Sequence, residues 1–271
     1  MKFSVAIFSF LSTLASVGSV IDCAKGDPSY RSYARPVAAE ALNSSTFTVP
    51  VDLELVLEID ISVSIDIVER NAQRDGYLAA FRDRAIIHAL TSGPLRRSAV
   101  IYIEWAAEDE QTIVIPWTLI DGFEAAEQFA IALRHARRQS RFGATSISAA
   151  LAFGAASFDG NRFDGARRII DISGDGVNNE GLPTYRIRDA LVAKGITING
   201  LPLMLTENWL GYPQYDVDIE QFYRAQVIGG SDAFLISVRR PNDFKRALRT
   251  KLLREIAGDH RIEFSAFALQ R

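Results

Sequence analysis

The sequence predicts an α/β fold with a doubly wound, mostly parallel central sheet, one antiparallel edge strand and helices on both faces. Between residues 51 and 257, short apolar runs alternate with longer amphipathic segments, as in parallel sheets that helices cover. Two β-rich runs, 99–105 and 112–119, are joined only by a short acidic turn, which predicts an antiparallel pair. At 271 residues and 48% hydrophobic content, the chain can bury one sizeable core.

The elements of the first half follow from the spacing of their apolar residues. Alternating apolar residues predict a strand over 53–59. Helical spacing predicts one helix over 67–90, with Gly76 as its weak point. The other expected elements of this half are strands over 99–105 and 112–119 and helices over 123–138 and 146–158.

The second half repeats the alternation of strands and helices. Ligands of such sheets gather at the carboxyl ends of the strands, so a functional site is expected at that edge. The expected elements are strands over 168–172, 196–205 and 233–238 and helices over 185–194, 218–227 and 241–256.

The N-terminus predicts export. Lys2 is followed by an apolar stretch, 3–21, that has no charge until Asp22, as in a secretory signal peptide. We expect a signal peptide over 1–20, a linker or extended arm over 21–50, and one folded domain over 51–271. An uncleaved anchor is the alternative, although about nineteen moderately apolar residues are borderline for spanning a bilayer. After removal of the signal, no stable membrane span is expected.

Composition excludes several classes of function. The 30 basic and 33 acidic residues leave a formal charge of −3, without the basic excess that nucleic-acid binding requires. Three histidines and one cysteine are too few for the common zinc sites or for a disulfide framework.

A candidate metal site begins where the first strand ends. Asp60, Ser62 and Ser64 are spaced by two residues, so their oxygens project to the same side of an extended chain. Carboxylate and hydroxyl oxygens suit a hard divalent cation such as Mg²⁺. The plainer alternative is a strand that ends in a polar loop, with Ser64 or Asp66 as the N-cap of the next helix.

Two later loops bring further oxygen ligands to the same edge. Thr145 follows a glycine before a predicted helix, and Asp175 stands between two glycines after a predicted strand. Taken alone, Thr145 or Ser146 makes a good N-cap, and Asp175 is typical of a tight turn. An EF-hand is excluded, because Leu182 occupies the position of its bidentate glutamate.

In order and spacing, these residues resemble the metal-ion-dependent adhesion site of von Willebrand factor type A (vWA) domains. The resemblance covers about 51–257 and implies the Rossmann-like arrangement of that domain. Other segments look like a family of uncharacterised, exported bacterial proteins built on this domain. These segments are Trp105, Pro116 with Trp117, and the stretches 170–176, 195–201 and 227–230.

The resemblance implies a role for each residue of the site. Ser62 and Ser64 would bind the metal directly, Thr145 directly or through water, and Asp60 and Asp175 largely through water. Mg²⁺ is the expected ion, with Mn²⁺ or Ca²⁺ as substitutes, and its open position would take a carboxylate from a partner. The strand departs from the family pattern in having Val63 in place of glycine and in carrying Glu54 and Glu58. A carboxylate buried beside the sheet needs a partner.

The sequence therefore predicts an exported, divalent-cation-dependent binding module that captures a protein through an Asp or Glu carboxylate, with a glycan as a weaker alternative. An enzyme is not expected, because the chain has no nucleophile elbow, zinc-protease motif or phosphate-binding loop. The alternatives are a metal-dependent hydrolase, with Asp60 or Asp175 as base towards metal-bound water, and a domain that the metal only stabilises. The histidines His88, His135 and His260 are distant from the site in sequence.

Two segments are candidates for partner binding. Aromatic side chains Trp209, Tyr212 and Tyr215 follow a parallel strand on the metal side, although their loop could equally fold over its own apolar edge. Arginines at the end of a predicted helix could attract an acidic partner, or could simply complement the helix dipole. These arginines are Arg134, Arg137, Arg138 and Arg141. Movement of the closing helix, 241–256, is a further hypothesis by analogy.

Overall fold

The computed structural model of the protein describes residues 48–258 except 66, 138–143 and 205–217. All described residues belong to one compact unit. The predicted signal peptide and nearly all of the predicted linker lie outside the described residues. No helix in the described part of the chain is long and apolar enough to cross a membrane.

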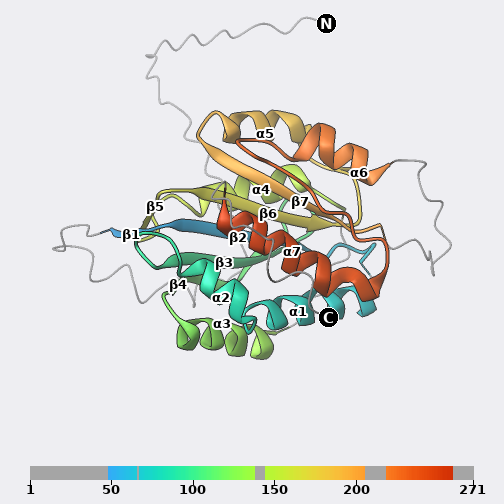
Figure 1. Cartoon of the computed structure of the whole chain (residues 1–271). Coiled ribbons are helices and arrows are strands. Elements are labelled where there is room, and N and C mark those ends of the chain that lie inside the picture. The colour runs from blue at the N-terminus through green and yellow to red at the C-terminus, as the bar shows by residue number, and fades with distance from the viewer. Residues whose placement is uncertain (1–47, 66, 138–143, 205–217, 259–271) are drawn as a thin grey trace, which may run out of the picture. The chain divides into compact units, whose positions relative to one another are not determined.

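A five-stranded sheet with the order β4-β3-β2-β6-β7 forms the centre of this unit (Figure 1). All neighbouring strands are parallel except β3 and β4, which pair antiparallel at one edge. The predicted mostly parallel sheet with one antiparallel edge strand is thus confirmed. The strands are β2 (Leu53–Asp60), β3 (Ser98–Trp105), β4 (Gln111–Ile120), β6 (Arg168–Gly174) and β7 (Ile196–Pro202).

Helices cover both faces of the sheet, because the central strands carry apolar side chains on both faces. Every residue of β2 and β3 is buried, as expected for parallel strands between two helical layers. On one face Leu55 and Leu57 pack with α1 (Ile67–Ala80), α2 (Arg84–Leu90), α3 (Phe123–His135) and α7 (Phe244–Ala257). On the other face Val56 packs with α4 (Ile147–Ala156) and α5 (Thr184–Val192) (Figure 1).

The single helix predicted over 67–90 is wrong, because the structure has two helices there. The break lies at Asp83, whose carboxylate caps α2 by accepting hydrogen bonds from the amides of Ala85 (2.8 Å) and Ile86 (3.3 Å). Gly76, the predicted weak point, lies inside α1. A Cβ there would be 2.5 Å from the ring of Phe244, so glycine allows α1 and α7 to pack closely.

The strand predicted over 233–238 is also wrong. This segment makes only two isolated parallel bridges to the β7 side, at Leu235 and Val238. The helix predicted over 218–227 is divided into α6 (Ile219–Phe222) and a π-helical turn, η2 (Tyr223–Val227), and a 3₁₀ turn, η3 (Pro241–Asp243), precedes α7. A short parallel pair, β1 (Val49–Val51) with β5 (Phe163–Gly165), was not predicted.

Candidate functional site

The carboxyl edge of the sheet places three loops side by side. Asp60 ends β2, and the register that pairs Ile59 with Ser173 puts the end of β6 next to it. Asp175 follows immediately after β6. The loop before α4 contributes Thr145, while the next residue, Ser146, is the N-cap of α4 and accepts from the Ala149 amide at 3.4 Å. Thr145 is therefore not the cap, and its hydroxyl is available to the site.

Hydrogen bonds connect all five residues predicted for the site. The Ser62 amide donates to Asp60 Oδ1 at 2.7 Å, and the Ser62 and Ser64 hydroxyls are 3.1 Å apart. Ser64 donates to Asp175 Oδ1 at 2.7 Å, and Thr145 donates to Ser62 Oγ at 3.4 Å. The five oxygen-bearing side chains thus form one continuous cluster from three loops.

This cluster has a buried floor and an open rim. Asp60 and Ser62 are fully buried and Thr145 is 5% exposed, whereas Ser64 is exposed and Asp175 is partly exposed. A ligand can therefore reach the cluster from the Ser64 and Asp175 side. Asp66, the other candidate cap at this edge, lies outside the described residues.

The electrostatics of the cluster fit a divalent cation. Asp60 Oδ2 is buried and has no hydrogen-bond partner among the described residues. Burial, followed by the nearby charge of Asp175, raises the pKa of Asp60 to about 8. A cation held between the two carboxylates would reverse that effect and satisfy the buried oxygen. The described residues contain no group of three or more His, Cys, Asp or Glu suited to a metal, so the cluster relies on its hydroxyls.

Neighbouring amide side chains hold the loops in place, and the sequence prediction missed them. Asn179 Oδ1 accepts from the Thr145 amide at 2.8 Å, and Asn178 Oδ1 accepts from the Ser148 amide at 2.9 Å. Beneath the site, Gln73 donates to the carbonyl of Asp60 at 3.4 Å. The two asparagines follow closely after Asp175, which is the only sequence signal that could have identified them.

Tyr223, which the sequence prediction also missed, adds a second buried polar atom to the floor. Its hydroxyl is fully buried in the π-helical turn and makes no hydrogen bond within the described part of the chain. The Tyr223 hydroxyl and Asp60 Oδ2 each lie 2.8 Å from the place that a Cβ at Gly174 would occupy. Burial, with a smaller contribution from Asp60, raises the pKa of Tyr223 well above its usual value. Glycine at position 174 is required because the two oxygens flank it.

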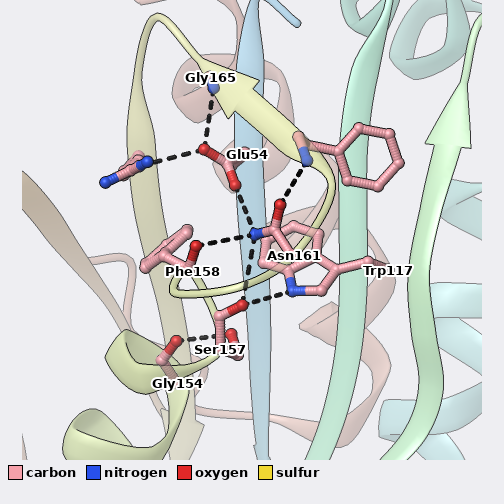
Figure 2. Close-up of polar contacts among 9 residues, drawn as sticks. Glu54, Trp117, Gly154, Ser157, Phe158, Asn161 and Gly165 are labelled. Carbon is pink, nitrogen blue, oxygen red and sulfur yellow. Dashed lines mark hydrogen bonds and ion pairs between the residues drawn. The ribbon is translucent and has the colours of Figure 1, made fainter. Parts of the chain in front are cut away.

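The two glutamates that depart from the family pattern have different surroundings. Glu54 is buried and accepts from Asn161 at 2.7 Å, from the Gly165 amide at 2.9 Å and from Arg168 at 3.1 Å (Figure 2). It therefore has the partners that burial requires. Neither carboxyl oxygen of Glu58 has a hydrogen-bond partner among the residues described, and burial raises its pKa well above the usual value.

The candidate partner-binding residues are only partly covered by the structure. Trp209, Tyr212, Tyr215, Arg138 and Arg141 lie outside the described residues, so their proposed roles stay predictions. Arg134 and Arg137 are exposed at the end of α3 and just beyond it. Of the histidines, His88 and His135 are exposed on helices and His260 is not described.

Solved structures with the same fold support the vWA architecture. The chain resembles proximal thread matrix protein 1 from the mussel byssus, at 16% identity and TM-score 0.54, over 75% of this chain and 47% of that one. It also resembles the pilus adhesin SpaC from Lactobacillus rhamnosus GG, at 12% identity and TM-score 0.56, over 76% of this chain and 30% of that one. A vWA protein from Catenulispora acidiphila matches at 15% identity and TM-score 0.49, over 76% and 43%.

The likenesses to the mussel protein and to SpaC establish the fold. The match spans less than half the length of each of the three proteins. A further structure of the mussel protein, with a zinc-occupied metal-ion-dependent adhesion site (MIDAS) motif, matches at 11% identity and TM-score 0.51. The match covers 74% of this chain and 46% of that one. A search of curated protein sequences finds no match. One family model, described as "Protein of unknown function (DUF1194)", matches residues 50–260. This chain, with its vWA fold, therefore belongs to the DUF1194 family.

Proposed function

We propose that this protein is an exported, periplasmic or secreted binding module that captures a protein partner through a divalent cation. The observation that carries the proposal is the cluster of Asp60, Ser62, Ser64, Thr145 and Asp175, joined by hydrogen bonds at one edge of the sheet. Its buried floor and exposed rim suit a ligand that arrives from solvent.

The donor set favours a hard cation that keeps an affinity for one more oxygen. Two carboxylates only just balance a divalent charge, and three neutral hydroxyls add no further negative charge. A bound cation would therefore remain electrophilic and would accept a carboxylate from an Asp or Glu of the partner. Mg²⁺ is the proposed ion, with Mn²⁺ or Ca²⁺ as substitutes.

Within this function, each residue has a separate task. Ser62, Ser64 and Thr145 present hydroxyl oxygens to the cation, while Asp60 and Asp175 supply the negative charge that holds it. The Ser62 amide, which donates to Asp60 Oδ1, fixes the orientation of that carboxylate. Asn179 holds the Thr145 loop against the loop that follows β6.

Calorimetric titration with Mg²⁺, with and without a peptide that bears a carboxylate, tests the proposal. We expect the wild-type protein to bind Mg²⁺, and the peptide to bind only when the metal is present. The Ser62→Ala and Ser64→Ala variants should lose both signals. Ser231→Ala, a substitution at an exposed serine distant from the carboxyl edge, is the matched control. Peptide binding of equal strength in chelator and in Mg²⁺ would refute metal-dependent capture.

A further inference from the structure

A second feature of the carboxyl edge is a groove rich in arginine. It has a volume of about 560 Å³ and lies between the segment that ends at Val238 and the beginning of α7. Its charged residues are Arg239, Arg240, Asp243 and Arg246, and Ile236 and Ala247 form an apolar part of its wall. We call this feature the arginine groove. Its volume is in the range of about 300–1,000 Å³ that is typical of ligand sites.

Arginines around the groove outnumber the carboxylates that neutralise them. Asp243 accepts from both Arg240 (2.7 Å) and Arg246 (2.9 Å). Glu220 accepts from both Arg224 (3.1 Å) and Arg239 (2.9 Å). Among the described residues, these four guanidinium groups share two carboxylates, so the ion pairs themselves carry a net positive charge.

The same arginines retain unused hydrogen-bond donors that face solvent. Arg239, Arg240 and Arg246 are 64%, 75% and 77% exposed, and within the part of the chain that the structure describes each makes one contact to a carboxylate. A guanidinium has five N–H donors in a fork that matches a carboxylate. The groove can therefore accept additional carboxylates, and its apolar wall suits the methylene groups of acidic side chains better than it suits a free inorganic anion.

The groove lies on the same edge of the sheet as the candidate metal site. From β2 to Val238 there are three lateral steps, because β6 pairs with β2, β7 pairs with β6, and Val238 bridges to Leu203. Three strand spacings amount to about 14 Å. An extended peptide crosses that distance in about four or five residues.

We propose that the arginine groove binds an acidic segment of the partner protein, rich in Asp or Glu, as a second contact beside the metal site. On binding, the exposed N–H donors of the three arginines would hydrogen-bond to carboxylates of the acidic segment instead of to water. The idea that one peptide reaches both sites rests on the proposed function, whereas binding in the groove itself does not need the metal.

Fluorescence anisotropy with a labelled oligoglutamate peptide tests the groove in chelator at low salt. We expect the Arg240→Gln/Arg246→Gln double variant to bind roughly tenfold more weakly than wild type. Asp243→Asn should bind more tightly, because it frees donors of both arginines, and this opposite sign separates a specific effect from misfolding. Arg96→Gln/Arg162→Gln, at exposed arginines just before the amino ends of β3 and β5, is the control and should bind like wild type.

Three outcomes would overturn the proposal. They are unchanged binding in the groove double variant, equal binding of an oligoglutamine peptide, and inorganic phosphate that binds as tightly as the acidic peptide. A peptide with an aspartate about five residues from the glutamates then tests the bridge in Mg²⁺. If Mg²⁺ fails to strengthen its binding while the groove variants behave as expected, the metal function fails and the groove stands.

Discussion

The two ends of β2 show two ways in which a buried carboxylate is accommodated. Glu54 at the amino end and Asp60 at the carboxyl end are both fully buried on the same strand. Both oxygens of Glu54 accept hydrogen bonds, from Asn161, Gly165 and Arg168 (Figure 2). Asp60 accepts at Oδ1 from Ser62, but its Oδ2 has no such partner among the described residues. The chain itself stabilises the first carboxylate, and an external cation is suited to stabilise the second.

A third buried carboxylate, Glu58, lies between these two on β2. It has neither hydrogen-bond donors among the described residues nor a place at the rim where a cation could bind. Its side chain points to the face covered by α4, where a Cβ at Gly154 would be 2.6 Å from its Oε1. Glu58 is fully buried within the sheet, away from the open rim of the site, so that no cation from solvent is expected to reach it. Residues of one chemical type on one strand thus have structural, functional and destabilising roles according to their surroundings.

The largest expected effect is on stability, from Glu54→Ala. This change leaves the donors of Asn161, Gly165 and Arg168 without their acceptor, and buried unpaired donors are costly. We expect the free energy of unfolding to fall by about 3 kcal/mol. This loss is at the lower end of that expected for breaking a fully buried ion pair, because Arg168 is 38% exposed. Urea denaturation measures it. Mg²⁺ affinity should be unchanged, and a selective loss of metal binding would contradict the structural role.

At the other end of the strand, Asp60→Asn should raise the free energy of unfolding in chelator at neutral pH, whereas Glu54→Ala lowers it. Because the folded pKa of Asp60 is raised from 3.8 to about 8, the folded state binds more protons than the unfolded state. Wild-type stability in chelator should therefore fall as pH rises from about 4 to about 8, and Mg²⁺ should restore it. Asp60→Asn should reduce the pH dependence and weaken Mg²⁺ binding by roughly 100-fold. Thermal unfolding across this pH range measures the pH dependence, and calorimetry measures the Mg²⁺ affinity. Identical pH profiles for wild type and Asp60→Asn would show that Asp60 is not the group that titrates.

Glu58→Gln should stabilise the protein by about 1 kcal/mol at neutral pH, an effect in the usual range for a buried polar change. Burial raises the folded pKa of Glu58, so wild-type stability is lost as pH increases above the unfolded value of 4.5. The neutral amide has the same shape and does not pay this cost of ionisation. Denaturation at pH 5 and pH 8 measures the difference, which should grow with pH. A destabilised variant would mean that Glu58 has an essential interaction.

Sequence patterns predicted the fold and the site where the signal is local or periodic. The spacing by two of Asp60, Ser62 and Ser64 is visible in the sequence, and the mostly parallel sheet with one antiparallel edge followed from the alternation of strand and helix segments. The rule that ligands gather at carboxyl ends connected Thr145 and Asp175 to the same edge. The break at Asp83 was missed because helical spacing of apolar residues continues through it. A cap that interrupts a periodic pattern is a weaker signal than the pattern itself.

Other features could not be predicted because they depend on contacts between distant segments. Glu54 meets its partners Asn161 and Gly165 more than a hundred residues away along the chain. The segment 233–238 has an apolar strand pattern, but only its Leu235 and Val238 form bridges, to Gly200 in β7 and to Leu203 just after it. Likewise, nothing near Tyr223 in the sequence indicates that its hydroxyl lies beside Asp60.

The smallest expected effect separates Tyr223 from an ordinary core tyrosine. If its hydroxyl helps to orient Asp60, Tyr223→Phe should weaken Mg²⁺ binding by roughly threefold. This is less than the loss seen for residues that hydrogen-bond to metal ligands, because the Tyr223 hydroxyl makes no such bond in the described chain. Tyr77→Phe is the matched control, because Tyr77 is also a fully buried tyrosine but packs on the opposite face of the sheet. Calorimetry should give wild-type Mg²⁺ affinity for Tyr77→Phe. Equal affinities for both variants would show that the end of β2 is completed without Tyr223.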